Sequence, residues 1–64
     1  MPKIRRGNYI FIGWVGDYSP RHVHVYRDRK LVVKWDLDAW QAMQGKPTAQ
    51  IMKYLKQLVE EGLL

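Results

Sequence analysis

The apolar residues of this chain recur at two different spacings, and the change falls at Pro47. Before it, residues 21–27 alternate strictly: Val23 and Val25 face one way, and His22, His24 and Tyr26 face the other, as in a β-strand. After it, a single apolar stripe recurs at helical spacing, formed by Ile51, Tyr54, Leu55, Leu58 and Val59. This order predicts an α+β domain, with a small antiparallel sheet of three to four strands and one C-terminal helix packed on one face.

Three segments before Pro47 predict strands. Residues 8–15 are rich in aromatic and β-branched side chains, and residues 16–20 form a loop of turn-favouring residues. Residues 21–27 are joined to residues 31–36 by a short turn at 28–30. In that last strand Leu31, Val33 and Trp35 share one face.

Residues 37–44 fit two conformations. Either Asp36 or Asp38 caps a helical turn, or a turn at Asp38–Ala39 leads into a short edge strand that ends at Gly45. We favour the strand, because Gly45 follows too soon for a stable helix. Beyond it, Thr48 is the expected N-terminal cap of the helix and Gly62 its C-terminal stop.

The 64 residues form a single domain, 1–64, with a small core. The chain has no cysteine, so disulfides and thiolate metal sites are excluded. A metal held by His and Asp, or a partner chain such as a second copy in a homo-oligomer, is left as a source of added stability. A membrane span needs about 20 apolar residues, which this sequence lacks. Met1–Arg6 is charged without an apolar segment after it, so we expect no secretory signal, no membrane partner and a cytoplasmic location.

The positive charge is concentrated in the strand-forming half. Residues 1–34 carry eight Lys and Arg against two Asp, a net +6, whereas residues 35–64 carry a net −1. A positive field of this kind attracts RNA, DNA or an acidic protein. The alternative is a solvated basic surface that keeps a small protein in solution.

The most unusual segment is Ser19-Pro-Arg-His-Val-His-Val-Tyr26. Its His-x-His pair places both imidazoles on one face of a strand, and three interpretations of that pair remain open. The histidines fill the sheet face structurally. Or they bind a metal ion together with Asp36 or Asp17, although the nearby arginines disfavour a cation. Or they perform acid–base chemistry on RNA.

In the RNA interpretation, His22 and His24 are the candidate catalytic pair. Phosphodiester cleavage by the ribose 2′-OH needs one proton acceptor and one proton donor, and imidazoles titrate near neutral pH. This chemistry is metal-independent and needs no cofactor. The candidate RNA or partner contacts are a stacking tyrosine and three cations: Tyr26, Arg21, Arg27 and Lys34.

Several segments together resemble a family of very small bacterial proteins named as a domain of unknown function, number 4160. They are Met1-Pro-Lys-Ile4, Asp17-Tyr-Ser-Pro-Arg-His-Val-His-Val25, Leu31-Val-Val-Lys-Trp-Asp36 and Gly45-Lys46. The Pro-x-His-x-His-Val motif at residues 20–25 is the most specific part. The resemblance implies a neighbouring short gene and an arrangement like a toxin–antitoxin operon. It supplies no catalytic residues.

Two function classes follow. The first is a toxin-like component of a toxin–antitoxin module that acts on RNA, with a small protein partner encoded nearby. The second is a non-enzymatic binding module or accessory subunit that docks a partner protein or DNA through the open face of the sheet. Whether the protein is an enzyme is left open by the sequence.

Overall fold

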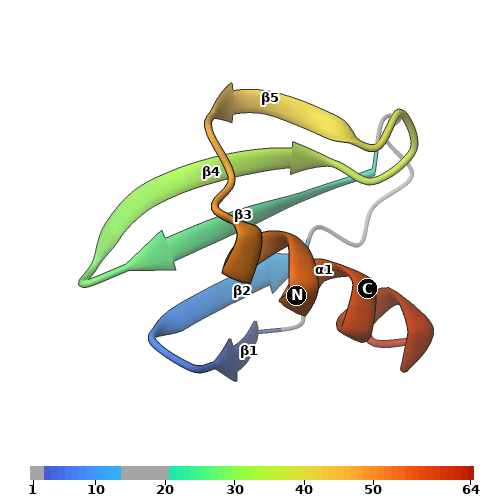
Figure 1. Cartoon of the computed structure of the whole chain (residues 1–64), viewed down its shortest axis with the longest axis horizontal. Coiled ribbons are helices and arrows are strands. Elements are labelled where there is room, and N and C mark those ends of the chain that lie inside the picture. The colour runs from blue at the N-terminus through green and yellow to red at the C-terminus, as the bar shows by residue number, and fades with distance from the viewer. Residues whose placement is uncertain (1–2, 14–20) are drawn as a thin grey trace.

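Each strand of the sheet pairs with the next strand along the chain. In the computed structural model, which describes residues 3–13 and 21–64, five antiparallel strands lie in the order β1-β2-β3-β4-β5 (Figure 1). They are β1 Lys3–Arg6, β2 Tyr9–Gly13, β3 His22–Arg27, β4 Lys30–Asp36 and β5 Gln41–Gly45, and helix α1 is Ala49–Glu60. The predicted α+β arrangement is confirmed, but the sheet has five strands rather than three to four.

The strand missing from the sequence prediction is β1. It forms a hairpin with β2, in which Arg6 lies opposite Tyr9, and Gly7 in the turn has φ +58°. A β-carbon on Gly7 would lie 2.7 Å from the hydroxyl of Tyr54 on α1, so this glycine also permits the close approach of the helix. Ile4 is the sole apolar residue of the strand, which explains why the hydrophobic pattern did not reveal it.

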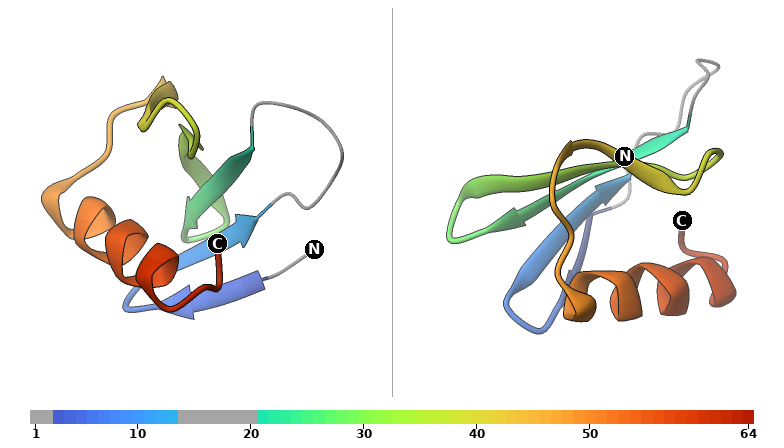
Figure 2. Two further views of the ribbon diagram at one scale, coloured as in Figure 1. Left: turned by 90° about the vertical axis from the view of Figure 1, so that its right-hand side faces the viewer. Right: turned by 45° about the horizontal axis from the view of Figure 1, so that its top comes forward.

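The core lies between α1 and one face of the sheet. Alternate residues of the three central strands and one side of the helix are buried there: Tyr9, Phe11, Val23, Val25, Val33, Trp35, Ile51, Leu55 and Leu58. Figure 2 shows α1 on one side of the sheet, with no described element on the other. Val23 and Val25 therefore face the helix, as the alternation predicts.

A β-bulge changes the expected pattern of β4. The register between β3 and β4 shifts between Val25 and Tyr26, so Val25 lies opposite Val33 and Tyr26 opposite Leu31. Val32 is the extra residue, and Leu31 moves off the core face to 40% exposure. The prediction that Leu31 shares a face with Val33 and Trp35 is therefore wrong, because alternation does not continue through a bulge.

The predicted turn between β3 and β4 is confirmed, with an unfavourable backbone. Asp28 and Arg29 have φ +52° and +66°, the left-handed conformation that both central residues of a type I′ hairpin turn require. Glycine adopts it freely, whereas for other residues it costs about 1–2 kcal/mol.

Arg29→Gly is accordingly expected to stabilise the protein by about 0.5–1 kcal/mol, after the greater flexibility of glycine in the unfolded chain is subtracted. For a domain of this size the melting temperature should rise by about 2–8 °C. Arg29→Ala removes the same charge without relieving the backbone, so it is the matched control. Equal melting temperatures for the two variants would show that charge, and not backbone strain, sets the effect.

The favoured interpretation of residues 37–44 is confirmed. A turn over residues 37–40 leads into β5, which ends at Gly45, and all five residues of β5 are exposed. Trp40 in this turn has φ +55°, and its ring packs edge-to-face on Trp35 with the ring centroids 5.4 Å apart.

Helix α1 has the predicted ends. The hydroxyl of Thr48 accepts a hydrogen bond from the backbone N–H of Ile51. After the helix, Gly62 (φ +77°) donates to the carbonyl of Val59, and Leu63 donates to that of Leu58, which is the Schellman pattern. The predicted apolar stripe includes one residue that is not buried, because Val59 is 41% exposed.

Four predictions concern residues outside the described ranges. They are the end of the first predicted strand at Trp14 and Val15, the loop at 16–20, Asp17 as a candidate metal ligand, and Pro20 at the start of the Pro-x-His-x-His-Val motif. Within the described ranges, no helix is long and apolar enough to cross a membrane.

Candidate functional site

The side of the sheet opposite α1, called here the open face, carries three rows of residues that run across the strands. The strand register defines the rows. The central row is Lys3, Ile12, His24, Lys34 and Gln44. On one side of it lies the row Arg5, Ile10, Tyr26 and Leu31, and on the other the row His22, Asp36 and Gln41.

The two candidate histidines project together from this face. Their ring centroids are 5.4 Å apart, and the ring of Tyr26 lies 6.3 Å beyond that of His24. All three side chains are half-buried, with Ile10 and Ile12 on the neighbouring strand. The prediction that His22, His24 and Tyr26 share the side of the sheet opposite the helix is thus confirmed, and no helix or strand of the described residues covers that side.

His24 has an environment that favours the neutral imidazole. Its Nε2 atom is closed to solvent and has no hydrogen-bond partner in the described part of the chain. Burial lowers the pKa of His24 below its ordinary value of 6.5, and the neighbouring charges of His22 and Lys34 lower it further. The neutral form of the ring is therefore favoured.

This lowered pKa predicts a loss of stability on acidification. The unfolded chain protonates His24 near its ordinary pKa, while the folded chain does so only at lower pH. Between those two values the unfolded state binds more protons, so the free energy of unfolding falls as the pH falls. Unfolding in urea from about pH 7.5 to 5.5, above the titration of most carboxylates, measures the slope. His24→Asn should reduce the slope of the free energy of unfolding against pH. An unchanged slope would show that His24 is not the group responsible.

Cations lie on both sides of the imidazoles. Lys34 is beside His24 on β4, and Lys3 lies two strands away from His24 in the opposite direction, with Arg5 in the next row. With strands about 4.8 Å apart, the Cα atoms of Lys3 and Lys34 are separated by about 14 Å. The missing β1 explains why the sequence prediction omitted Lys3 and Arg5. The spacing Lys3-Ile4-Arg5 before Gly7-Asn8 is the signal that identifies them.

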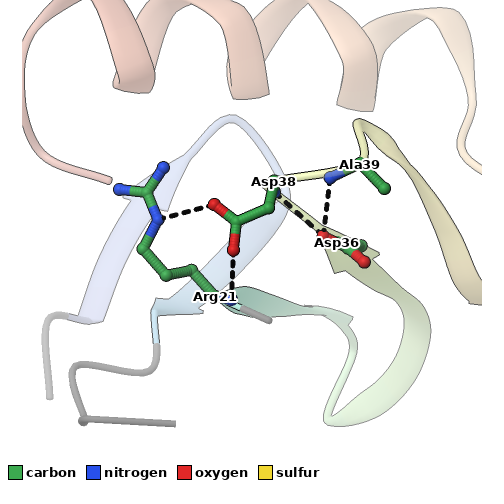
Figure 3. A network of polar contacts seen from close by, with 4 residues as sticks. All are labelled: Arg21, Asp36, Asp38 and Ala39. Carbon is green, nitrogen blue, oxygen red and sulfur yellow. Dashed lines mark hydrogen bonds and ion pairs between the residues drawn. The ribbon is translucent and has the colours of Figure 1, made fainter. Parts of the chain in front are cut away.

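The carboxylate of Asp36, which lies on the open face, already accepts hydrogen bonds from the backbone. Asp36 is 8% exposed, and its Oδ1 accepts hydrogen bonds from the backbone N–H groups of Asp38 and Ala39, both at 2.9 Å. Figure 3 shows these contacts at the turn that precedes β5. Asp36 therefore shapes the turn, and the net charge that the described residues place on the open face is positive.

Arg21 is held at the end of the sheet by Asp38. Its backbone N–H and its Nε atom donate to the two carboxylate oxygens of Asp38, each at 2.9 Å (Figure 3). These hydrogen bonds, the backbone one first, lower the pKa of Asp38. Arg21 was a candidate RNA contact, but its charge is already paired with a carboxylate.

Arg27 lies on the other side of the sheet from the histidines. Its guanidinium carbon lies 5.7 Å from the centre of the Tyr9 ring, and Tyr9 belongs to the core face. The strict alternation of β3 already separates residue 27 from residues 22, 24 and 26, so the sequence could have excluded it. Of the four candidate binding residues, the structure brings Tyr26 and Lys34 together with the histidine pair.

Metal ligands do not come together in the described part of the chain. Within residues 3–13 and 21–64, no group of three or more His, Asp or Glu residues is placed to hold an ion. Asp36, one of the expected ligands, has one carboxylate oxygen engaged by two backbone N–H groups.

Comparisons of the chain with protein-family models, with curated proteins and with solved structures found no match. The resemblance to the family of unknown function remains a prediction.

Proposed function

We propose that this protein binds single-stranded RNA on the open face, and that it does so as the toxin-like component of a two-gene module. The observation that carries the proposal is the central row, in which an imidazole and an apolar side chain lie between Lys3 and Lys34. Lysines at the two sides bind phosphates, and Tyr26 in the next row stacks on a base.

A single strand fits this surface better than a duplex does. The face is a twisted β-layer with half-buried side chains, and none of its described elements projects as a helix or a ribbon into a groove. Unstacked bases lie flat on such layers and contact aromatic rings. RNA is proposed over DNA, because the ribose 2′-OH is a hydrogen-bonding group that DNA lacks, and the open face offers it exposed polar side chains such as Gln44.

Cleavage is the more specific version of this proposal. One imidazole takes the proton of the 2′-OH as the 2′-oxygen attacks phosphorus, and the other protonates the departing 5′-oxygen, which leaves a 2′,3′-cyclic phosphate and a 5′-hydroxyl. The lowered pKa of His24 favours the neutral imidazole, which is the form that the first step requires. Binding is better supported than cleavage, because Nε2 of His24 is closed to solvent.

The test is a titration of labelled single-stranded RNA of about ten nucleotides, with DNA and duplex RNA as controls. Three phosphate contacts, from Lys3, Arg5 and Lys34, predict that log K falls with log salt with a slope of about −2. Equal affinity for duplex RNA, or a slope near zero, would contradict the proposal. Tight binding of an acidic protein without RNA binding would favour the docking alternative.

The cleavage version is tested in the same samples. Products ending in a cyclic phosphate are expected from the parent chain and not from His22→Ala or His24→Ala. If both variants inhibit growth as strongly as the parent when induced in bacteria, the histidines have no catalytic role.

A further inference from the structure

The two edges of the sheet differ sharply in charge. The edge strand β1 carries Lys3, Arg5 and Arg6 among its four residues. The opposite edge strand, β5, consists of Gln41, Ala42, Met43, Gln44 and Gly45, and none of them is charged. Charged residues on an edge discourage pairing with other strands, so β1 is protected by its charges, whereas β5 has none and is interrupted by a bulge at Met43.

All five residues of β5 are exposed, and none of the other described strands lies beyond it (Figure 1). The register with β4 shifts so that Gln44 lies opposite Lys34 and Ala42 opposite Trp35. Met43 between them has no partner residue on β4, and it is 45% exposed. An apolar side chain and a row of backbone donors and acceptors are therefore presented at the same edge.

We propose that β5 pairs antiparallel with β5 of a second copy of this chain, to form a continuous ten-stranded sheet. The charge distribution selects this occupant. Two chains of net charge +5 repel each other, and an uncharged edge lets their backbones meet without placing like charges directly opposite. Self-pairing of one strand is a closed, twofold contact, and the cationic β1 edges stop the assembly at two copies.

The symmetry of this contact has a consequence for the open face. A twofold axis that relates two antiparallel strands of one sheet is perpendicular to the sheet, so both open faces lie on the same side. Gln44 ends the central row of each copy at β5, so the dimer brings the ends of the two rows close together at its interface. The dimer doubles the length of the cationic surface, although the pairing itself does not depend on RNA.

The test is sedimentation velocity of the RNA-free protein over a wide range of concentrations. The parent chain is expected to shift from one to two copies as the concentration rises, while Met43→Lys stays monomeric. Val59→Lys is the matched control, because Val59 is also apolar and about equally exposed (41%) but lies on α1. It should dimerise like the parent.

Amide hydrogen exchange provides a second readout on the parent chain alone. The β5 amides that point away from β4 should exchange more slowly at high concentration, and the α1 amides should not change. A parent chain that is monomeric at every concentration, or a Met43→Lys variant that dimerises equally well, would overturn the proposal. Because no RNA is present, failure of the RNA proposal would leave this result intact.

Discussion

Gly45→Ala is expected to destabilise the protein by about 3 kcal/mol or more, which is a large part of the total stability of a domain this small. Gly45 has φ +78°, where a β-carbon costs about 1–2 kcal/mol. The same β-carbon would lie 2.2 Å from the carbonyl oxygen of Val32. Since that oxygen belongs to the backbone at the β4 bulge, it can move away only if the strand moves.

The control for Gly45 is another glycine with the same backbone conformation and free space around it. Gly62 has φ +77°, and a β-carbon there would meet nothing within 4 Å beyond its immediate chain neighbours. Gly62→Ala should therefore cost only about 0.5–1 kcal/mol, which is the conformational penalty less the lower flexibility of alanine in the unfolded chain. Urea unfolding of both variants gives the comparison. Equal losses would show that the contact with Val32 is relieved without cost.

Lys34→Glu is expected to weaken binding of single-stranded RNA by about tenfold or more at low salt, and to reduce the salt slope by about 0.7. Lys34 lies next to His24 in the central row, between the imidazole and β5. A carboxylate there removes one phosphate contact and repels the strand. Fluorescence anisotropy with the same labelled oligonucleotide measures both quantities.

The matched control reverses a charge elsewhere. Lys53 is exposed on α1, on the other side of the sheet, and Lys53→Glu changes the net charge by the same amount. It should reduce the affinity by much less, through the general field alone. If both variants lose the same affinity, the open face is not the binding surface, and the effect of Lys34 comes only from net charge.

Local patterns predicted much of the fold. The alternation of residues 22–26 and the helical spacing from Ile51 to Leu58 each depend on one element that buries one side, so the sequence displays them directly. Gly45 likewise marked the end of β5. The strand β1 was not recognisable in this way, because with one apolar residue in four it is defined by its pairing with β2.

The errors at Leu31 and Val59 have a different cause. A bulge inserts a residue without changing the composition of the strand, so nothing in the sequence showed that Leu31 would leave the core face. Val59 fits the spacing of the stripe, but it lies at the margin of the buried side of the helix, where its side chain is 41% exposed.

At the site, residues on one strand were predictable and contacts between distant segments were not. The shared side of His22, His24 and Tyr26 follows from the period of a strand. The pairing of Arg21 with Asp38 joins residues 17 positions apart, and it depends on where the β4–β5 turn lies. The placement of Lys34 beside His24 likewise depends on the register of two strands.

The most direct test of the account is nuclear magnetic resonance mapping of the surface that contacts RNA. Backbone and imidazole signals are recorded while an unlabelled single-stranded oligonucleotide is added. We predict shifts at the open face, with the largest at Ile12, His24 and Lys34, and little change along the exposed side of α1. Shifts confined to α1, or no shifts at all at low salt, would contradict the claim that the open face binds RNA.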